Sequence, residues 1–238
     1  MKTFQTTYDR QLLNDLAHLK NYPQLLPYIG SKWGESKKIL FLAESHYLPG
    51  NEIKSSGTEI NFQKNWYSLN ENSFPKSLDY LKNYINTRSV IEKADDKSNA
   101  GFHKPLSIYY NIKNEIRINL KGLEKENLIF PFFSIYNYFQ KPSFIETDSI
   151  KNTAQDDEIA FDTLKKVYKI INPELIVFVT KKGYEAFKKQ QKIKSDNTFN
   201  NVIIKRTPHA GSAWWNKKAK AYNNKTGREY FIEIIKSL

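Results

Sequence analysis

The sequence predicts an α/β domain with three layers, α/β/α, around a central and mainly parallel four-stranded sheet. Four short apolar segments have the composition of buried strands, and amphipathic segments separate them along the chain. Strands that are apolar throughout are typical of parallel sheets, because helices cover both faces of such sheets. The chain length of 238 residues suits one domain of this kind, and we expect residues 1–238 to form it.

Each expected strand is a short apolar run that polar residues or turn signals delimit. The four strands are expected at residues 38–44, 127–135, 175–179 and 202–205. In parallel sheets, ligands bind in the crevice beyond the carboxyl ends of the strands. The residues that follow these strands are therefore the first candidates for a functional site.

Helices are expected where apolar residues recur at positions three and four apart. Leu12, Leu16 and Leu19 have this spacing, so residues 1–37 predict an N-terminal helical extension before the first strand. Residues 45–73 are rich in Gly, Asn and Ser and predict a long active-site loop. The expected helices cover residues 8–22, 74–86, 106–120, 153–171, 184–192 and 227–238.

Composition restricts the classes of function. The net charge of +12 and the pI near 9.5 favour a polyanionic partner such as nucleic acid, although lysines on solvated helix faces produce the same balance. The absence of cysteine excludes disulfides, thiolate zinc sites and iron–sulfur clusters. Without a secretory signal or a membrane-length apolar run, we expect a cytoplasmic monomer that does not associate with membranes.

Polar side chains follow three of the four expected strands. Glu44 ends the first strand, Asn137 follows the second, and His209 follows the fourth. Each residue alone is more often a cap, a turn residue or a structural histidine. Together they place a carboxylate, an amide and an imidazole at one edge of one sheet, which is what a catalytic site requires.

The order of these motifs resembles the uracil-DNA glycosylase superfamily. The segment 43–47 (AESHY) is similar to the first motif of that family, which usually begins with Gly. Asn137, with Pro142 after it, matches the asparagine that recognises the base. The segment 209–212 (HAGS) matches the second catalytic motif, usually His-Pro-Ser. The resemblance extends over residues 38–215 as a pattern of short motifs in the right order.

The resemblance implies a monofunctional DNA glycosylase that flips a pyrimidine out of DNA and hydrolyses its N-glycosidic bond without a cofactor. It implies that His209 stabilises the departing base and that Asn137 reads the pairing edge of the base. Glu44 is then the candidate for orienting water or supporting the sugar cation. Ser45 replaces the Asp of the best-known branch, and the candidate catalytic set is Glu44, Ser45 and His209. No lysine stands out as a Schiff-base nucleophile.

Further aromatic and imidazole groups are candidates for recognising the base. Tyr47 falls where the resemblance implies an aromatic ring against position 5 of uracil, and His46 lies beside it. Phe62 and Trp66 belong to the expected loop, where they either stack on the flipped base or pack the loop onto the domain. The sequence leaves these two interpretations open.

The segment after His209 is the candidate DNA-binding region. Trp214 and Trp215 fall where the resemblance implies an apolar wedge, and we expect one to be buried and the other exposed, since adjacent side chains point in opposite directions in extended chain. Phosphate contacts are expected from the basic residues that follow, although a solvated basic loop has the same composition. The candidate DNA-binding residues are Ser212, Trp214, Trp215, Lys217, Lys218 and Lys220.

The sequence predicts no metal site, and it leaves two alternative functions open. His18, His46, His103 and His209 lack metal-ligand spacing, so no metal site is expected. One alternative is an inactive nucleic-acid-binding module of the same fold; another is an enzyme that acts on free nucleosides or nucleotides. The identity of the excised base also stays open: it is either uracil or a bulky 5-substituted pyrimidine of the kind found in some viral genomes. The second choice would indicate a defence role.

Overall fold

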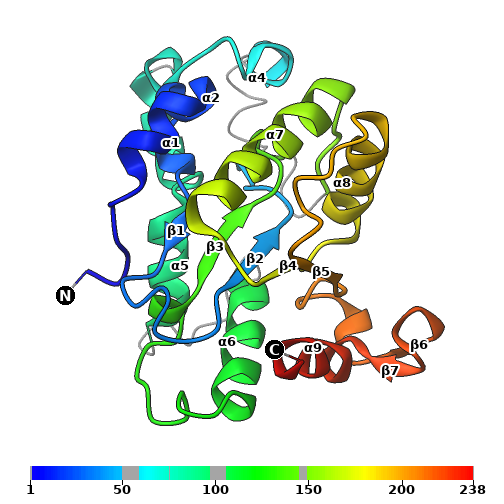
Figure 1. Ribbon diagram of the computed structural model, residues 1–238. Helices are drawn as coiled ribbons and strands as arrows, with labels where there is room; N and C mark the ends of the chain where they lie inside the picture. Colours follow the sequence, from blue (N-terminus) through cyan, green and yellow to red (C-terminus); the bar gives the residue numbers. More distant parts are fainter. Residues whose placement is uncertain (1, 50–58, 75, 97–105, 145–148, 238) are drawn as a thin grey trace.

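A computed structural model describes residues 2–49, 59–74, 76–96, 106–144 and 149–237 (Figure 1). Its centre is a mixed sheet with the strand order β1-β3-β2-β4-β5, in which the last four strands run parallel and β1 is antiparallel to β3. The strands are β1 (Tyr28–Ile29), β2 (Ile39–Ala43), β3 (Ser134–Asn137), β4 (Leu175–Phe178) and β5 (Ile203–Arg206). The α/β class and the four parallel strands are confirmed, and β1 is an addition.

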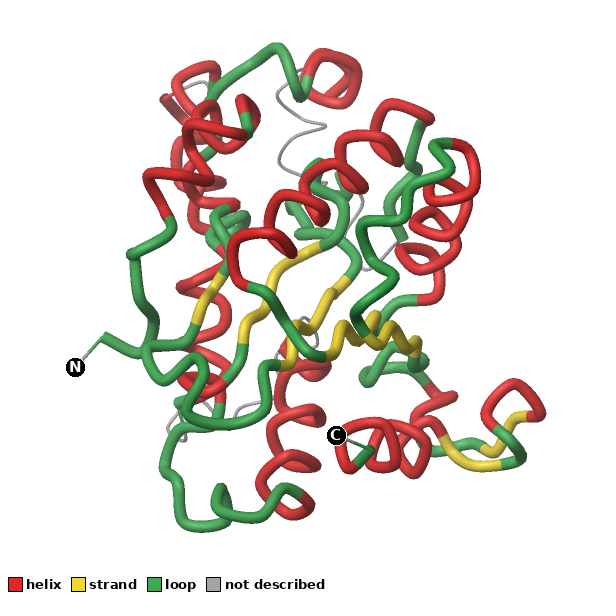
Figure 2. The backbone as a smooth tube through the Cα atoms, in the orientation of Figure 1, coloured by secondary structure: helices red, strands yellow, loops and turns green. Residues whose placement is uncertain are grey.

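Helices pack on both faces of this sheet (Figure 2). Alternate strand residues divide between two hydrophobic clusters, as strand geometry requires: Leu40 and Leu42 belong to one, and Ile39 and Phe41 to the other. The first cluster includes side chains of α1 (Asp9–Asp15), α2 (Ala17–Asn21), α7 (Ala154–Ile171) and α8 (Lys181–Ile193). The second includes side chains of α5 (Thr87–Asp95), α6 (Ser107–Asn119) and α9 (Gly227–Lys236).

Several element boundaries differ from the expected ones. The helix expected over residues 8–22 is interrupted at Leu16, whose extended backbone separates α1 from α2. The strand expected over 127–135 begins at Ser134, because a 3-10 turn, η6 (Phe130–Phe132), contains Pro131. The stretch expected to be one long loop contains α4 (Glu59–Asn65) and the 3-10 turn η2 (Glu71–Ser73); its residues 50–58 lie outside the described part.

Two further segments differ from expectation. Residues 76–83 form a 3-10 helix, η3 (Lys76–Asn83), where an α-helix was expected. The helix α5 was not expected, since its short apolar face contains only Val90, Ile91 and Ala94. A two-stranded hairpin of β6 (Lys218–Ala219) and β7 (Lys225–Thr226) projects beside α9 (Figure 1). None of these changes moves the carboxyl ends of the parallel strands, which determine where the candidate site lies.

Candidate active site

The carboxyl ends of the parallel strands open into a cavity of about 760 Å³. The register pairs Ala43 with Asn137, so the ends of β2 and β3 lie side by side. The opposite wall comes from the segment before α5, from α5 itself and from α6. The sequence-predicted residues that line the cavity are Glu44, Ser45, His46, Tyr47, Asn137 and His209. The structure therefore brings together the residues that follow three separate strands.

Glu44 is partly buried, and hydrogen bonds fix the orientation of its carboxylate. The Thr180 hydroxyl donates to Oε2 at 2.8 Å, and the Ile150 backbone N–H donates to Oε1 at 3.3 Å. The Ser149 hydroxyl also donates to Oε1. Thr180 is the N-cap of α8, where its side chain accepts from the Gly183 N–H. Sequence analysis missed these partners because they are more than 100 residues from Glu44 in the chain.

His209 is held as a neutral imidazole with a defined tautomer. The Gly211 backbone N–H donates to Nδ1 at 3.1 Å, so the proton of the neutral ring is on Nε2. Burial lowers the pKa of His209, and the nearby charge of Glu44 opposes this shift. A Cβ atom at position 211 would lie 2.6 Å from Ser107 Oγ and 3.1 Å from the His209 ring, so glycine allows this close contact. The ring therefore has an N–H donor at near-neutral pH.

The loop that carries His209 is attached to α6. Asn111 Nδ2 donates to the Ala210 backbone carbonyl at 2.7 Å. Because α6 packs against the second face of the sheet, this bond fixes the loop relative to the strands that carry Glu44 and Asn137. Asn111 had no local sequence signal for this role, since it is 99 residues from its partner.

Asn137 and Ser45 are buried polar residues in the wall of the cavity. Asn137 is 4% exposed and uses its backbone carbonyl to accept from Gln140. The Ser45 hydroxyl is buried and has no hydrogen-bond partner among the described residues. Buried polar groups in this condition call for a ligand or an ordered water.

His46 and Tyr47 line the cavity in different ways. The His46 ring is 2.9 Å from the Thr87 hydroxyl through Nε2, and a second hydrogen bond joins it to the Tyr84 backbone. Burial lowers the pKa of His46 to about 4, so this neutral ring is bonded within the protein. Tyr47 is partly buried and pairs with Ser143 in an isolated parallel bridge. Tyr47 thus remains the aromatic candidate beside the base, and His46 connects the strand end to the opposite wall.

Phe62 and Trp66 do not line this cavity. Trp66 is 1% exposed and stacks on Tyr22 with a centroid distance of 4.0 Å, while its Nε1 donates to the Gln140 carbonyl at 3.1 Å. Phe62 stacks on Phe74 at 4.7 Å. Of the two interpretations left open, the structure favours packing, because core side chains cover these rings. The expectation that they stack on a flipped base is corrected accordingly.

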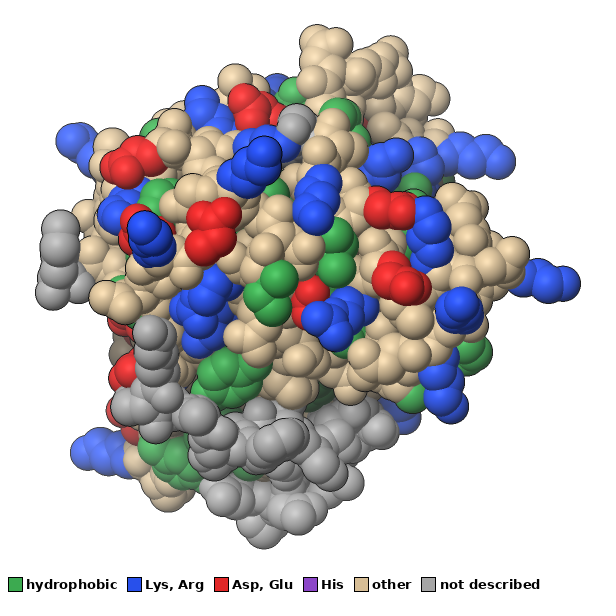
Figure 3. Space-filling view, turned by 90° about the horizontal axis from the view of Figure 1, so that it is seen from below, with side chains coloured by type: hydrophobic (Ala, Val, Ile, Leu, Met, Phe, Trp, Pro, Cys, Tyr) green, Lys and Arg blue, Asp and Glu red, His purple; other side chains and the backbone are tan. Residues whose placement is uncertain are grey.

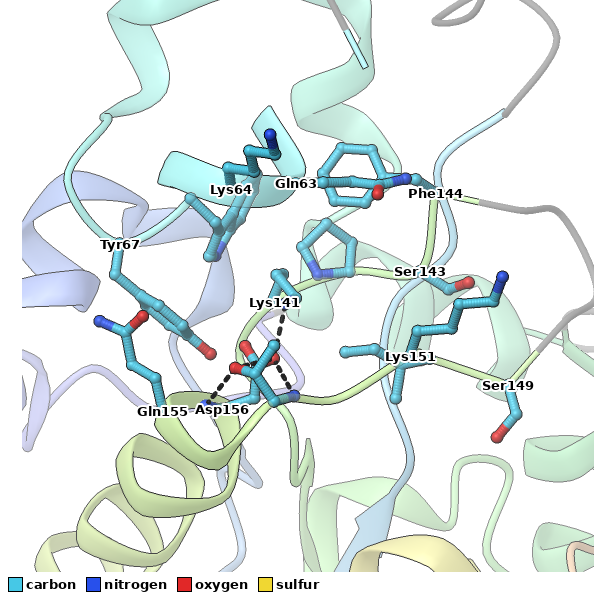
Figure 4. A pocket seen from close by; sticks show the side chains of 14 residues that line it. Gln63, Lys64, Tyr67, Lys141, Ser143, Phe144, Ser149, Lys151, Gln155 and Asp156 are labelled. Atoms are coloured by element: carbon cyan, nitrogen blue, oxygen red, sulfur yellow. Dashed lines mark hydrogen bonds and ion pairs between the residues drawn. The ribbon is translucent and has the colours of Figure 1, made fainter. Parts of the chain in front are cut away.

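A second cavity of about 360 Å³ lies near the N-terminus of α7 (Figure 4). Its wall contains a buried ion pair, with Lys141 Nζ 2.5 Å from Asp156 Oδ2. The same carboxylate accepts from the Thr153 backbone N–H at 2.7 Å, which completes the capping box of α7. Ser149 and Ile150, two of the three described residues that bond the Glu44 carboxylate, also line this cavity. The sequence predicted a helix over residues 153–171 but gave no signal for the ion pair.

The candidate DNA-binding residues occupy the segment after His209. Trp215 is 3% exposed and packs on Phe231, whereas Trp214 is 56% exposed, which confirms that one is buried and the other exposed. Both belong to a 3-10 turn, η7 (Ala213–Trp215). The Ser212 side chain is partly buried, and its backbone N–H donates to the His209 carbonyl at 2.8 Å. Lys217, Lys218 and Lys220 are exposed at and beside the β6–β7 hairpin.

The positive charge is not confined to that segment. Figure 3 shows one face of the molecule, where Lys and Arg side chains are interspersed with Asp and Glu. Many of the described lysines form ion pairs, such as Lys165 with Asp196 and Lys194 with Asp162. Net charge alone therefore does not locate a nucleic-acid interface.

A scan against protein-family models found no matching model, and searches of curated proteins and of solved structures found no match to this chain. In the described part of the chain, no helix has the length and apolar character needed to cross a membrane. The described His, Asp and Glu side chains do not gather in groups of three that could hold a metal ion. Functional assignment therefore rests on the chemistry of the cavity itself.

Proposed function

We propose that this protein is a monofunctional DNA glycosylase that flips a pyrimidine nucleotide into the 760 Å³ cavity and hydrolyses its N-glycosidic bond. The observation that carries the proposal is the meeting of Glu44, Asn137 and His209 from three strand ends in one cavity. These groups supply a carboxylate, an amide and a neutral imidazole. They match the three tasks of supporting a sugar cation, reading a base and stabilising a departing anion.

The role of His209 follows from its protonation state. As the bond between C1′ and N1 of the base breaks, its electron pair stays on the base and places negative charge on the ring. A donor aimed at charge that develops only in the transition state accelerates the reaction. His209 has its proton on Nε2 because Nδ1 accepts from the Gly211 N–H. It therefore stabilises the departing base by hydrogen bonding.

The roles of Glu44 and Ser45 concern the sugar and the water. A fixed carboxylate stabilises the positive charge that grows on the sugar, and Glu44 is fixed by Thr180 and the segment 149–150. The oxygen of one water bonds to C1′, and one of its protons passes by way of the Glu44 carboxylate to the departing base. Ser45 supplies an unpartnered hydroxyl at the cavity wall, which positions this water.

Base recognition is assigned to Asn137 and Tyr47. An amide offers one acceptor and two donor hydrogens, which suits the pairing edge of a pyrimidine. Uracil and a bulky 5-substituted pyrimidine are both proposed substrates. The size of the cavity favours the bulky substrate, because the cavity reaches beyond Tyr47 to Asn83 and Lys93. The eight heavy atoms of uracil, at about 30 Å³ for each water-sized group, would fill well under half of its 760 Å³.

The direct test is excision from a panel of DNA substrates. Purified protein is incubated with oligodeoxynucleotides that contain uracil, thymine, 5-hydroxymethylcytosine or a glucosylated cytosine, and alkali then converts abasic sites to strand breaks. We expect breaks at one modified or deaminated pyrimidine and none at normal bases. The matched control is Lys188→Ala, which changes an exposed lysine of α8 that is not among the described residues lining the cavity. DNA binding without excision of any base would instead support the inactive binding module.

A further inference from the structure

Two of the described exposed aromatic side chains contact each other, and one of them lines the cavity of the proposed active site. Aromatic residues make up 14% of the chain, yet among the described ones only Tyr80, Tyr84 and Trp214 are exposed by more than about a third. Tyr80 is 39% and Tyr84 is 48% exposed. Leaving a large ring in water forgoes burial free energy, so clustered exposed rings point to a binding surface.

Tyr80 and Tyr84 form one surface, which we call the tyrosine ledge. Tyr80 belongs to η3 and Tyr84 follows its end; their ring centroids are 6.3 Å apart in an edge-to-face arrangement. Tyr84 also lines the 760 Å³ cavity, so the ledge begins at the mouth of the proposed active site.

The ledge is attached to the strand end that carries Glu44. The His46 ring bonds the Tyr84 backbone and, through Nε2, the Thr87 hydroxyl. His46 is buried and lies two residues after Glu44. A base that rests on the ledge is therefore held in a fixed relation to a nucleotide in the cavity.

The charge next to the ledge suits a nucleic-acid strand. Lys93 is exposed and is the one Lys or Arg among the described residues that line the cavity. Aromatic rings that stack on bases, beside lysines that contact phosphates, are the usual means of binding single-stranded nucleic acid. In an intact duplex the neighbouring bases cover each other's faces, so the ledge fits bases that are unpaired and unstacked.

We infer that the tyrosine ledge stacks the nucleobases next to the flipped nucleotide, and that Lys93 contacts a phosphate of the same strand, so the substrate is single-stranded or locally unpaired DNA. This inference rests on the proposed function, since it takes the cavity to hold a flipped nucleotide. It gives His46 a positioning role, because His46 connects the ledge to the catalytic strand end.

The experiment measures the affinity of the full chain for a fluorescein-labelled oligodeoxythymidylate and for a duplex of the same length, by fluorescence anisotropy. The test variant is Tyr80→Ala/Tyr84→Ala, and Tyr80→Phe/Tyr84→Phe retains both rings. The matched control is Ile118→Ala, an exposed apolar side chain on α6 that is not among the described residues lining the cavity. All three change exposed side chains, and circular dichroism verifies the fold.

We expect the alanine variant to bind the single strand at least about fivefold more weakly for each stacked base that is lost. Its duplex affinity and the slope of log affinity against log salt should stay near those of the wild type, because phosphate contacts remain. The phenylalanine variant and Ile118→Ala should bind like the wild type. Lys93→Ala should instead reduce the salt slope by roughly 0.7 on single strands.

Three outcomes overturn the inference. They are an unchanged single-strand affinity of the alanine variant, an equal loss for the single strand and the duplex, and a loss in the phenylalanine variant. The substrate panel distinguishes failure here from failure of the proposed function. If the wild-type protein binds single strands through the ledge but excises no base, only the proposed glycosylase activity is refuted. Excision together with a ledge that plays no part in binding refutes only the inference.

Discussion

The cavity beside α7 and the cavity at the strand ends both contain buried polar side chains, but they differ in how those side chains bond. Beside α7, Lys141 and Asp156 pair with each other, and Thr153 donates to the same carboxylate. At the strand ends, the buried Ser45 hydroxyl has no partner among the described residues, and Asn137 lines the same cavity. In the first arrangement the two charged groups pair with each other and with the cap of α7, so this pair serves the fold. In the second, the Ser45 hydroxyl is left for a ligand or a water, beside Glu44, Asn137 and His209, which is why we place the function there.

This difference predicts opposite responses to substitution. Breaking the Lys141–Asp156 pair should lower stability and leave the activity of the folded protein intact. Removing the Ser45 hydroxyl should lower activity and leave stability nearly intact, because no described internal partner is lost. The following variants test this contrast, starting from the largest expected effect.

Breaking the buried ion pair should give the largest effect. Lys141→Met leaves the Asp156 carboxylate buried without its cation, and the loss of one partner from such a pair costs about 3–5 kcal/mol of unfolding free energy. Urea denaturation measures the change, and excision per folded molecule should match the wild type. The surface variant Lys181→Met is the control, since its pair with Glu185 is exposed and should contribute less than about 1 kcal/mol. Equal losses in the two variants would contradict the assignment of the Lys141 pair to stability.

His209→Ala should affect catalysis by roughly 100-fold, the usual effect of removing one donor to a developing anion. We expect the loss in single-turnover excision, with little change in DNA affinity or unfolding free energy, since the described hydrogen bond to the ring comes from a backbone N–H in the same loop. Asn111→Leu should produce a smaller loss, because it releases the Ala210 carbonyl and lets the loop shift. Near wild-type excision by His209→Ala would remove this residue from the mechanism.

The comparison between strand ends and surrounding elements also explains what the sequence could predict. The four parallel strands were predictable because an apolar run marks or directly precedes each of β2, β3, β4 and β5. The convergence of Glu44, Asn137 and His209 follows from the parallel topology. The partners of Glu44 were not predictable, because hydrogen bonds to Ser149 and Thr180 depend on how distant segments pack.

Aromatic residues show the same limit more clearly. The sequence placed Trp66 in an expected loop and Tyr84 in an expected helix. Only tertiary packing, such as the stacking of Trp66 on Tyr22, distinguishes the buried ring from the exposed one. Trp214 is exposed and Trp215 is buried, as predicted, although they lie in a 3-10 turn and not in extended chain. Sequence periodicity thus locates strand ends well, but it does not assign side chains within irregular segments.

Stability should decrease as pH falls below about 6.5, because two histidines are buried in neutral form. Burial lowers the pKa values of His18 and His46 to about 4. Between pH 6.5 and 4 the unfolded chain binds protons that the folded chain does not, so unfolding free energy falls as pH falls through this window. At pH 5.5 each histidine should contribute about 1.4 kcal/mol to the loss. His46→Gln should reduce the slope of unfolding free energy against pH; an unchanged slope would show that His46 is not neutral in the fold.

The smallest expected effect gives the sharpest test of the contrast between the cavities. Ser45→Ala removes a buried hydroxyl that has no described partner, so unfolding free energy should stay constant or rise by up to about 1 kcal/mol. Excision should nevertheless fall severalfold, with the change in kcat rather than in KM, because the hydroxyl positions the attacking water. Thr207→Val is the matched control: its hydroxyl is also buried without a described partner, but Thr207 is not among the described residues lining the cavity.

Thr207→Val should therefore leave both excision and stability near wild-type values. Ser45→Ala should lower excision but leave stability near the wild-type value. If Ser45→Ala destabilises the protein by more than about 1 kcal/mol, the hydroxyl has a structural partner and serves the fold, as the Lys141–Asp156 pair does. If both variants excise the base like the wild type, an unsatisfied hydroxyl is no guide to the active site in this protein. Loss of excision without loss of stability in Ser45→Ala alone would show that the strand-end cavity leaves polar groups unsatisfied because the substrate and its water complete them.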